Sequence, residues 1–278
     1  MIEKAFVSLV LAVLGLVAGA TLSGAQAESV QAQAVLTVSE SKRLIAKAVA
    51  NMPEIRSALK NGMVIITKGT TNTYVAEEIL GRKLAHGALL SGRTVPAESA
   101  PVFENVAAMS EIVLVNGVPA DSLSLAEAVR NLKQGDVVIK GANLLDYEHK
   151  TAGVLIGSNT AGTTGTFFPT VVARKVHLVI PVGLEKQASG NVLEIAGRMR
   201  EPVPSINETL SMFLLTGTIV TEIEALKILA DVSAFQIAAG GINGAEGAVT
   251  LVFRGTRANV EKALKLVESV QGEPPFVE

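Results

Sequence analysis

The sequence predicts an α/β fold in which helices cover both faces of a largely parallel sheet, followed by a small C-terminal α+β unit of ferredoxin-like type. Short, near-continuous apolar runs alternate with helix-like segments through most of the chain, and strands buried on both faces have this composition. Near the C-terminus, two apolar runs instead flank a glycine-rich turn between amphipathic helices, which is typical of a hairpin packed on helices. With 278 residues, the chain is long enough for one large domain or two ordinary ones.

The composition excludes several classes of partner. The chain has two tyrosines and no tryptophan, so it lacks the aromatic platforms on which single-stranded nucleic acid stacks. Its formal net charge of -2 supplies no basic surface for a phosphate backbone. There is no cysteine, and the three histidines do not have the spacing of a metal site. We therefore expect no nucleic-acid partner, no metal and no cofactor.

Residues 1–27 have the pattern of a secretory signal peptide. Lys4 precedes an apolar run over residues 5–20, and Ala25-Gln26-Ala27 supplies a small-x-small cleavage site. This pattern predicts export, to the periplasm or the extracellular space. If the segment is not cleaved, it would instead anchor the chain to the membrane. Residues 28–38 begin with small and polar residues and are predicted to be a linker.

Residues 39–201 are predicted to form the ligand-binding domain. A helix is expected over 39–60, split by Pro53, because apolar residues recur there at helical spacing. Further strands and helices are predicted to alternate, with strands at 63–66, 111–116, 137–140, 152–156 and 176–182 and helices at 70–81, 122–133 and 167–175. Ligands of a parallel sheet bind beyond the carboxyl ends of its strands, so the loops that follow these strands are the candidate site.

Residues 202–278 are predicted to form the second unit, which starts at Pro202-Val203-Pro204. Helical periodicity recurs at 221–230 and 257–270, and a hairpin is expected between 234–239 and 248–253. A hairpin turn explains the glycine-rich segment between these strands more simply than an anion loop does. An exposed apolar face on this hairpin would indicate an assembly surface.

The loop after the first strand is the leading candidate site. In Gly69-Thr70-Thr71-Asn72-Thr73, small residues lead directly from a strand into a helix. The first N–H groups of a helix have no partner within it and lie at the positive end of its dipole. Because Gly69 lets a ligand approach the backbone, the loop suits a phosphate or a carboxylate. Helix capping by threonine and asparagine explains the same residues without a ligand, and both interpretations stay open.

Two later segments would add donors at the same edge of a parallel sheet. Gly162-Thr163-Thr164-Gly165 belongs to a second loop of small residues ahead of a helix. Lys186 follows a strand and could offer its charge to a phosphate or a carboxylate. Together with the first loop, these residues predict a ligand cleft.

The order of loops over roughly residues 62–190 resembles the superfamily of ribose-5-phosphate isomerase, CoA transferases and lactate-utilisation proteins. In that isomerase a strand runs into a Gly-Thr-Gly-Ser-Thr phosphate loop, and Gly69-Thr70-Thr71-Asn72-Thr73 stands in its place. A later Asp-Gly-Ala-Asp-Glu run is matched by Lys140-Gly141-Ala142-Asn143-Leu144, and a Ser-Lys pair by Glu185-Lys186. The resemblance implies an α/β domain that holds an anion, with Lys140 and Asn143 among the binding residues.

The residues that perform chemistry in that superfamily differ in this chain. Lys140, Asn143 and Leu144 replace the acidic pair of the isomerase, and the glutamate motif of the CoA transferases is missing from the expected region. Proton abstraction needs a positioned base, for which Asp146 and Glu185 are the candidates. The leading hypothesis is a protein that binds a small anionic metabolite, phosphorylated or carboxylate. The alternatives are an isomerase or acyl/CoA transferase, and an envelope assembly or sensor protein that forms homo-oligomers.

Overall fold

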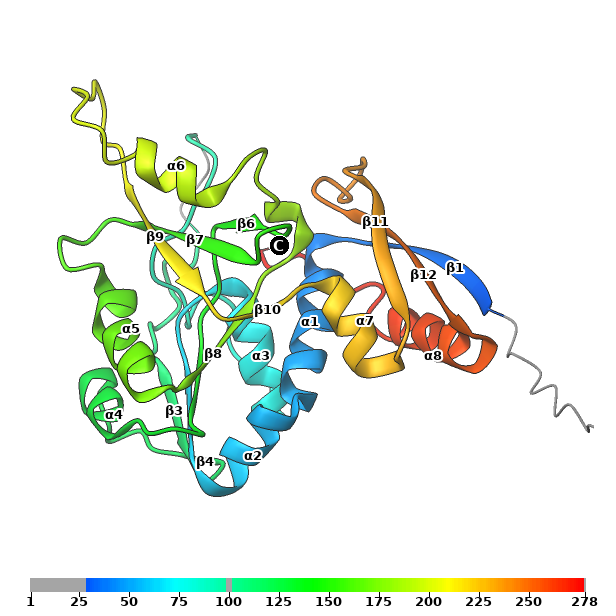
Figure 1. Cartoon of the computed structure of the whole chain (residues 1–278), viewed down its shortest axis with the longest axis horizontal. Helices are drawn as coiled ribbons and strands as arrows, with labels where there is room; N and C mark the ends of the chain where they lie inside the picture. The colour runs from blue at the N-terminus through cyan, green and yellow to red at the C-terminus, as the bar shows by residue number, and fades with distance from the viewer. Residues whose placement is uncertain (1–28, 99–101, 278) are drawn as a thin grey trace, which may run out of the picture.

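A computed structural model describes residues 29–98 and 102–277, and the predicted signal peptide lies outside these ranges. The described chain forms a mixed α/β fold with three sheets (Figure 1). None of the helices within these ranges is both long and apolar enough to span a bilayer.

The helices and strands follow one another through the fold with short connections in most places. In chain order they are β1 (Ser29–Leu36), α1 (Val38–Asn51), α2 (Pro53–Asn61), β2 (Met63–Ile66), α3 (Thr70–Leu80), β3 (Ile112–Val115), β4 (Val118–Pro119), α4 (Leu125–Asn131), β5 (Val137–Ile139), β6 (Leu144–Asp146), β7 (Thr151–Ile156), α5 (Gly162–Arg174), β8 (His177–Pro181), the 3-10 turn η1 (Leu184–Lys186), α6 (Val192–Arg198), β9 (Ser211–Thr216), β10 (Thr218–Val220), α7 (Glu222–Ala230), β11 (Ser233–Ala239), β12 (Val249–Thr256) and α8 (Arg257–Glu268).

The central sheet has six strands in the order β10-β8-β5-β2-β3-β4. Its pairs β10–β8, β8–β5 and β5–β2 are parallel, whereas β3 runs antiparallel to β2 and β4 antiparallel to β3. The sheet is therefore mixed. Strand β4 reverses because Asn116 and Gly117, both with positive φ, form a tight turn after β3, and so short a connection can join only antiparallel strands.

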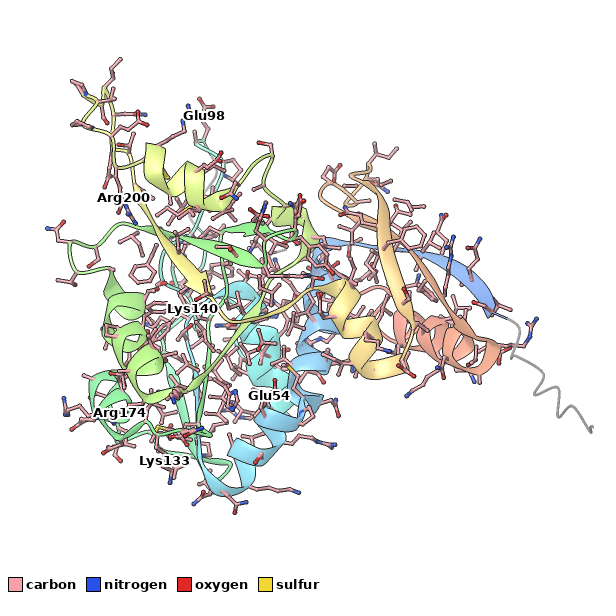
Figure 2. The ribbon with its side chains drawn as sticks, in the orientation of Figure 1. Glu54, Glu98, Lys133, Lys140, Arg174 and Arg200 are labelled. Carbon is pink, nitrogen blue, oxygen red and sulfur yellow. The ribbon has the colours of Figure 1, made fainter. Side chains whose placement is uncertain are left out.

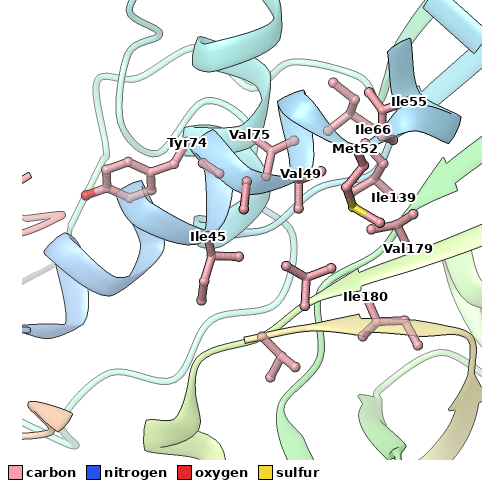
Figure 3. Packing of buried hydrophobic residues seen from close by; sticks show 14 of the residues in the cluster. Ile45, Val49, Met52, Ile55, Ile66, Tyr74, Val75, Ile139, Val179 and Ile180 are labelled. Atoms are coloured by element: carbon pink, nitrogen blue, oxygen red, sulfur yellow. The ribbon is translucent and has the colours of Figure 1, made fainter. Parts of the chain in front are cut away.

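Helices α1, α2 and α3 lie on one side of the central sheet, and α4 and α5 lie on the other (Figure 1). Figure 3 shows Ile45 and Val49 of α1 packed toward Ile139 of β5 and Val179 of β8. These side chains have no exposed surface, and their burial is the main force that holds α1 against the sheet. Pro53 begins α2, so the predicted break of the first helix at this residue is confirmed.

Strand β7, which we expected in the central sheet, belongs to a separate sheet of order β6-β7-β9. Only four residues separate β6 from β7, so the two strands pair antiparallel as a hairpin. Helix α6 packs on this sheet through Val192 and Ala196. The sequence analysis did not predict β6, β9 or α6.

Residues 28–38, predicted to be a linker, instead contain strand β1. It pairs antiparallel with β12 from Ser29↔Thr256 to Leu36↔Val249, which gives the third sheet the order β1-β12-β11. Alternate residues of β1 are the more buried ones, as in a strand with one covered face. The hairpin of β11 and β12 lies between α7 and α8 in the chain, as predicted, but its sheet is completed by the N-terminal strand.

Candidate functional site

Two lysines lie at the carboxyl ends of neighbouring parallel strands. Lys140 directly follows β5, and Lys186 lies in the turn η1 after β8. The Nζ of Lys140 donates to the Gly141 carbonyl at 3.2 Å, and the Nζ of Lys186 donates to the Ala142 carbonyl at 2.9 Å. Figure 2 labels Lys140, which directly follows β5, and Lys133, which precedes this strand in the chain. Lys140 and Lys186 thus bond to the carbonyls of two adjacent residues, Gly141 and Ala142.

The environment of Lys140 lowers the pKa of its amine to about 8. Burial is the largest cause, because it disfavours the charged form, and the ammonium of Lys186 adds repulsion. The carboxylate of Glu111 acts in the opposite direction and raises this pKa. Lys140, Lys186 and Glu111 therefore form one electrostatic cluster at the edge of the sheet.

Lys42 of α1 adds a third amine that the sequence analysis missed. Its side chain is buried, and burial lowers its pKa to about 8; the Glu185 carboxylate raises this pKa and the Lys186 ammonium lowers it further. In the sequence, Lys42 looks like an ordinary polar position of a helix. Only the packing of α1 between the central sheet and α7 places it inside the cluster.

Two carboxyl groups lie beside these amines. Glu222, the first residue of α7, is fully buried, and the Leu184 N–H donates to its carboxyl oxygens at 3.0 and 3.4 Å. Burial, and then the neighbouring Glu185 carboxylate, raise the pKa of Glu222 to about 7. Glu185 packs against Gly183, where an added Cβ would lie 1.8 Å from its Oε2. That oxygen is buried and has no hydrogen-bond partner among the described residues.

Asn72 ties the ends of β2 and β5 together at the start of α3. Its Nδ2 donates to the Thr67 carbonyl at 2.8 Å, to the Thr67 hydroxyl at 3.2 Å and to the Ile139 carbonyl at 3.2 Å. These three acceptors fix the orientation of the amide, so its Oδ1 faces away from them. Oδ1 is buried, lies near Gly141 and has no partner in the described part of the chain.

The first loop supplies no side-chain cap to α3, whose N-cap residue is Gly69. Thr73 donates its hydroxyl to the Gly69 carbonyl at 3.0 Å, and the Gly69 N–H donates to the Leu89 carbonyl at 2.8 Å. Thr70, Thr71 and Asn72 form the first turn of α3, and their N–H groups have no hydrogen-bond partner among the residues described. An anion bound at the start of α3 would accept from these three groups.

The second loop reaches the same edge of the sheet. The Thr163 hydroxyl donates to Glu111 at 2.9 Å, and Glu111 immediately precedes Ile112, which pairs with Ile66 at the end of β2. Gly165 has a packing role, because an added Cβ would lie 2.0 Å from the Thr160 carbonyl oxygen. The remaining two residues of this predicted set, Gly162 and Thr164, lie in the first turn of α5.

Asn143 directly precedes β6 and Asp146 ends it, so both belong to the β6–β7 hairpin. Asn143 accepts a hydrogen bond from the Leu155 N–H at 3.0 Å, which braces the hairpin. Asp146 accepts from His149 Nδ1 at 2.9 Å and from the Val192 N–H at 3.2 Å. Burial alone would raise the pKa of Asp146, but these hydrogen bonds hold it below its usual range. Asp146 thus stabilises a turn and the start of α6.

The prominent hollows of the described surface lie elsewhere. One is lined by α6 and the segment after it, one by the C-terminal tail with His86 and Phe103, and one by α1, α3 and Glu273. None of these three hollows is lined by Lys42, Lys140 or Lys186, so the predicted cleft is not among them. The chain matches no protein-family model, no curated protein and no solved structure.

Proposed function

We propose that the protein binds a small anionic metabolite, a carboxylate or a phosphate, at the carboxyl ends of β2, β5 and β8. The observation that carries this proposal is the pair Lys140 and Lys186. Both side chains are half-buried, and both contact backbone carbonyls without forming an ion pair to a described carboxylate. Confining two like charges in this way costs free energy. An anion bound between them would offset the cost.

The surrounding groups favour the same class of ligand. Lys42 adds a third positive charge, and the open N–H groups of Thr70 and Thr71 add backbone donors. A helix N-terminus next to lysines is a favourable environment for an anion. The contributing atoms come from α1, α3, β5 and η1, so the site depends on the assembled fold.

A thermal-shift screen with sugar phosphates, carboxylates, nucleotides and CoA esters tests the proposal, because a ligand that binds only the folded state raises its melting temperature. Lys186→Met should weaken the selected anion roughly ten- to a hundredfold, since a charge-assisted contact contributes about 1.5–3 kcal/mol. Lys133→Met is the matched control, because Lys133 is exposed and precedes β5, whereas the proposed site lies after this strand. Equal affinity of Lys186→Met and the parent would contradict the proposed site.

An acid–base enzyme is the second candidate, and Glu222 is the observation that favours it. A carboxyl whose pKa is about 7 can both accept and donate a proton near neutral pH. Asp146 is the weaker candidate, because its Oδ1 accepts from the His149 N–H and its Oδ2 accepts from the Val192 N–H.

Assembly is the third candidate function. Phe235 and Ile237 on β11, together with Ile242 in the hairpin turn, are 38%, 49% and 84% exposed. Exposed apolar side chains gathered on one hairpin favour a protein interface. Sedimentation velocity of the parent and of Phe235→Ser would show whether this hairpin forms oligomers.

A further inference from the structure

Residues 272–277 form a tail that follows α8, contains neither helix nor strand, and returns to α1 and α3. The two carboxylate oxygens of Glu273 accept from Nε and Nη2 of Arg43 in α1, at 3.0 and 2.8 Å. The Nζ of Lys83, just after α3, donates to the same carboxylate at 3.3 Å. Charge-assisted bonds in this paired geometry are among the stronger ones in proteins, so Glu273 fixes the near end of the tail.

The Phe276 ring fixes the far end of the tail on the segment that follows α3. It lies flat on the His86 ring, with the two centroids 4.4 Å apart and the planes at 7°. The Phe276 carbonyl accepts from Nδ1 of His86 at 3.1 Å. Phe276 also meets the edge of Phe103 at 5.9 Å, and Phe103 covers Gly87, where an added Cβ would lie 2.4 Å from its ring. Through these contacts the tail clamps the segment of residues 84–89.

The clamped segment in turn holds the start of α3. The Gly69 N–H donates to the carbonyl of Leu89 at 2.8 Å, and the Met109 N–H donates to the carbonyl of Ala88 at 2.8 Å. Leu89 is fully buried, and Gly69 is the N-cap residue of α3. A chain of printed contacts therefore leads from the tail, through residues 84–89, to the loop from which α3 begins.

We propose that the tail is a strap that holds residues 84–89 against Gly69, and that its release loosens this loop while the central sheet stays folded. The contacts of the strap are made by side chains, and a hollow of about 520 Å³ lies between its outer residues and residues 103–106. A segment held in this way can open locally at a lower free energy than the whole fold. Whatever draws the tail away therefore loosens the loop at the start of α3. This coupling lies outside the anion site itself, and its test needs no ligand.

Hydrogen exchange of single backbone amides, measured by NMR on the full-length protein, tests the strap. The weakened strap carries Glu273→Gln and Phe276→Ala, which remove the charge and the stacked ring. The amides of Gly69 and Met109 should exchange at least about tenfold faster in this variant, because both donate to the clamped segment. Thr67 is the internal control: its N–H lies two residues before Gly69 but donates to the Ile139 carbonyl of β5 at 3.0 Å. Its exchange should change less than about twofold.

A matched variant, Glu268→Gln with Val277→Ala, changes an exposed carboxylate near the end of α8 and a tail side chain that is 43% exposed. It should leave all three exchange rates as they are in the parent. If the weakened strap leaves the Gly69 and Met109 rates unchanged, the tail does not hold the segment and the proposal is wrong. If Thr67 accelerates as much as Gly69, the tail stabilises the whole fold, and the strap is refuted as well.

Discussion

Glu222→Gln tests whether the sheet edge holds a protonated carboxyl group in the folded protein. Glu222 is fully buried, and its pKa rises from 4.5 to about 7 because of burial and the Glu185 carboxylate. Glutamine retains an oxygen that can accept from the Leu184 N–H. Its amide group can donate to the buried Oε2 of Glu185, which has no partner among the described residues. The substitution therefore removes the titration while keeping the shape.

The sign and size of the effect follow from the two pKa values. Between the unfolded pKa of 4.5 and the folded pKa of about 7, the folded chain binds more protons at Glu222 than the unfolded chain does. The free energy of unfolding therefore falls as pH rises through this window. Between pH 5 and pH 8 the loss is about 2–3 kcal/mol, which corresponds to roughly 5–10 °C in melting temperature for a chain of this size.

The assay is thermal unfolding of the parent and of Glu222→Gln at pH 5 and pH 8. Relative to the parent, the variant should gain about 5–10 °C on going from pH 5 to pH 8. Glu224→Gln is the control from the same helix, since hydrogen bonds from Thr221 and Tyr147 outweigh burial and lower the pKa of Glu224. Its carboxylate is ionised at both pH values, so its difference from the parent should stay constant. A difference for Glu222→Gln that does not change with pH would refute a protonated Glu222.

Two further predictions concern the other side of α1 and α3. Arg43→Met should lower the free energy of unfolding, measured in urea, by about 3 kcal/mol, because Arg43 bonds at 2.5 Å to Glu77 and both side chains are buried. Arg56→Met, at an exposed position, is the control and should cost less than about 0.5 kcal/mol. An equally small loss for Arg43→Met would contradict the prediction. Phe276→Ala should lower the free energy of unfolding by about 1 kcal/mol and speed proteolysis of the C-terminal tail, because the Phe276 ring stacks on His86 with centroids 4.4 Å apart. An unchanged cleavage rate would show that this stack does not hold the tail.

The elements that local pattern fixes were predictable from the sequence, and those that depend on distant partners were not. The Met63–Ile66 run and the helix after it need only β-branched residues followed by a helix start. Strand β1 alternates between more and less exposed residues, but alanine and glutamine at residues 31–34 make this alternation too weak to identify. Its partner β12 lies more than two hundred residues away in the chain. Local periodicity carries no information about such a pairing.

The same distinction applies to the candidate site. Gly69, Lys140 and Lys186 follow predicted strands, so the rule for parallel sheets places them at one edge without knowledge of the fold. Lys42 and Glu222 join that edge only because α1 and α7 pack against each other and against the sheet. In sequence, Glu222 is an ordinary acidic residue in the first turn of a helix. Its unusual chemistry arises from full burial next to Glu185, so the titration of Glu222 reports on the tertiary arrangement of the site and not on its local sequence.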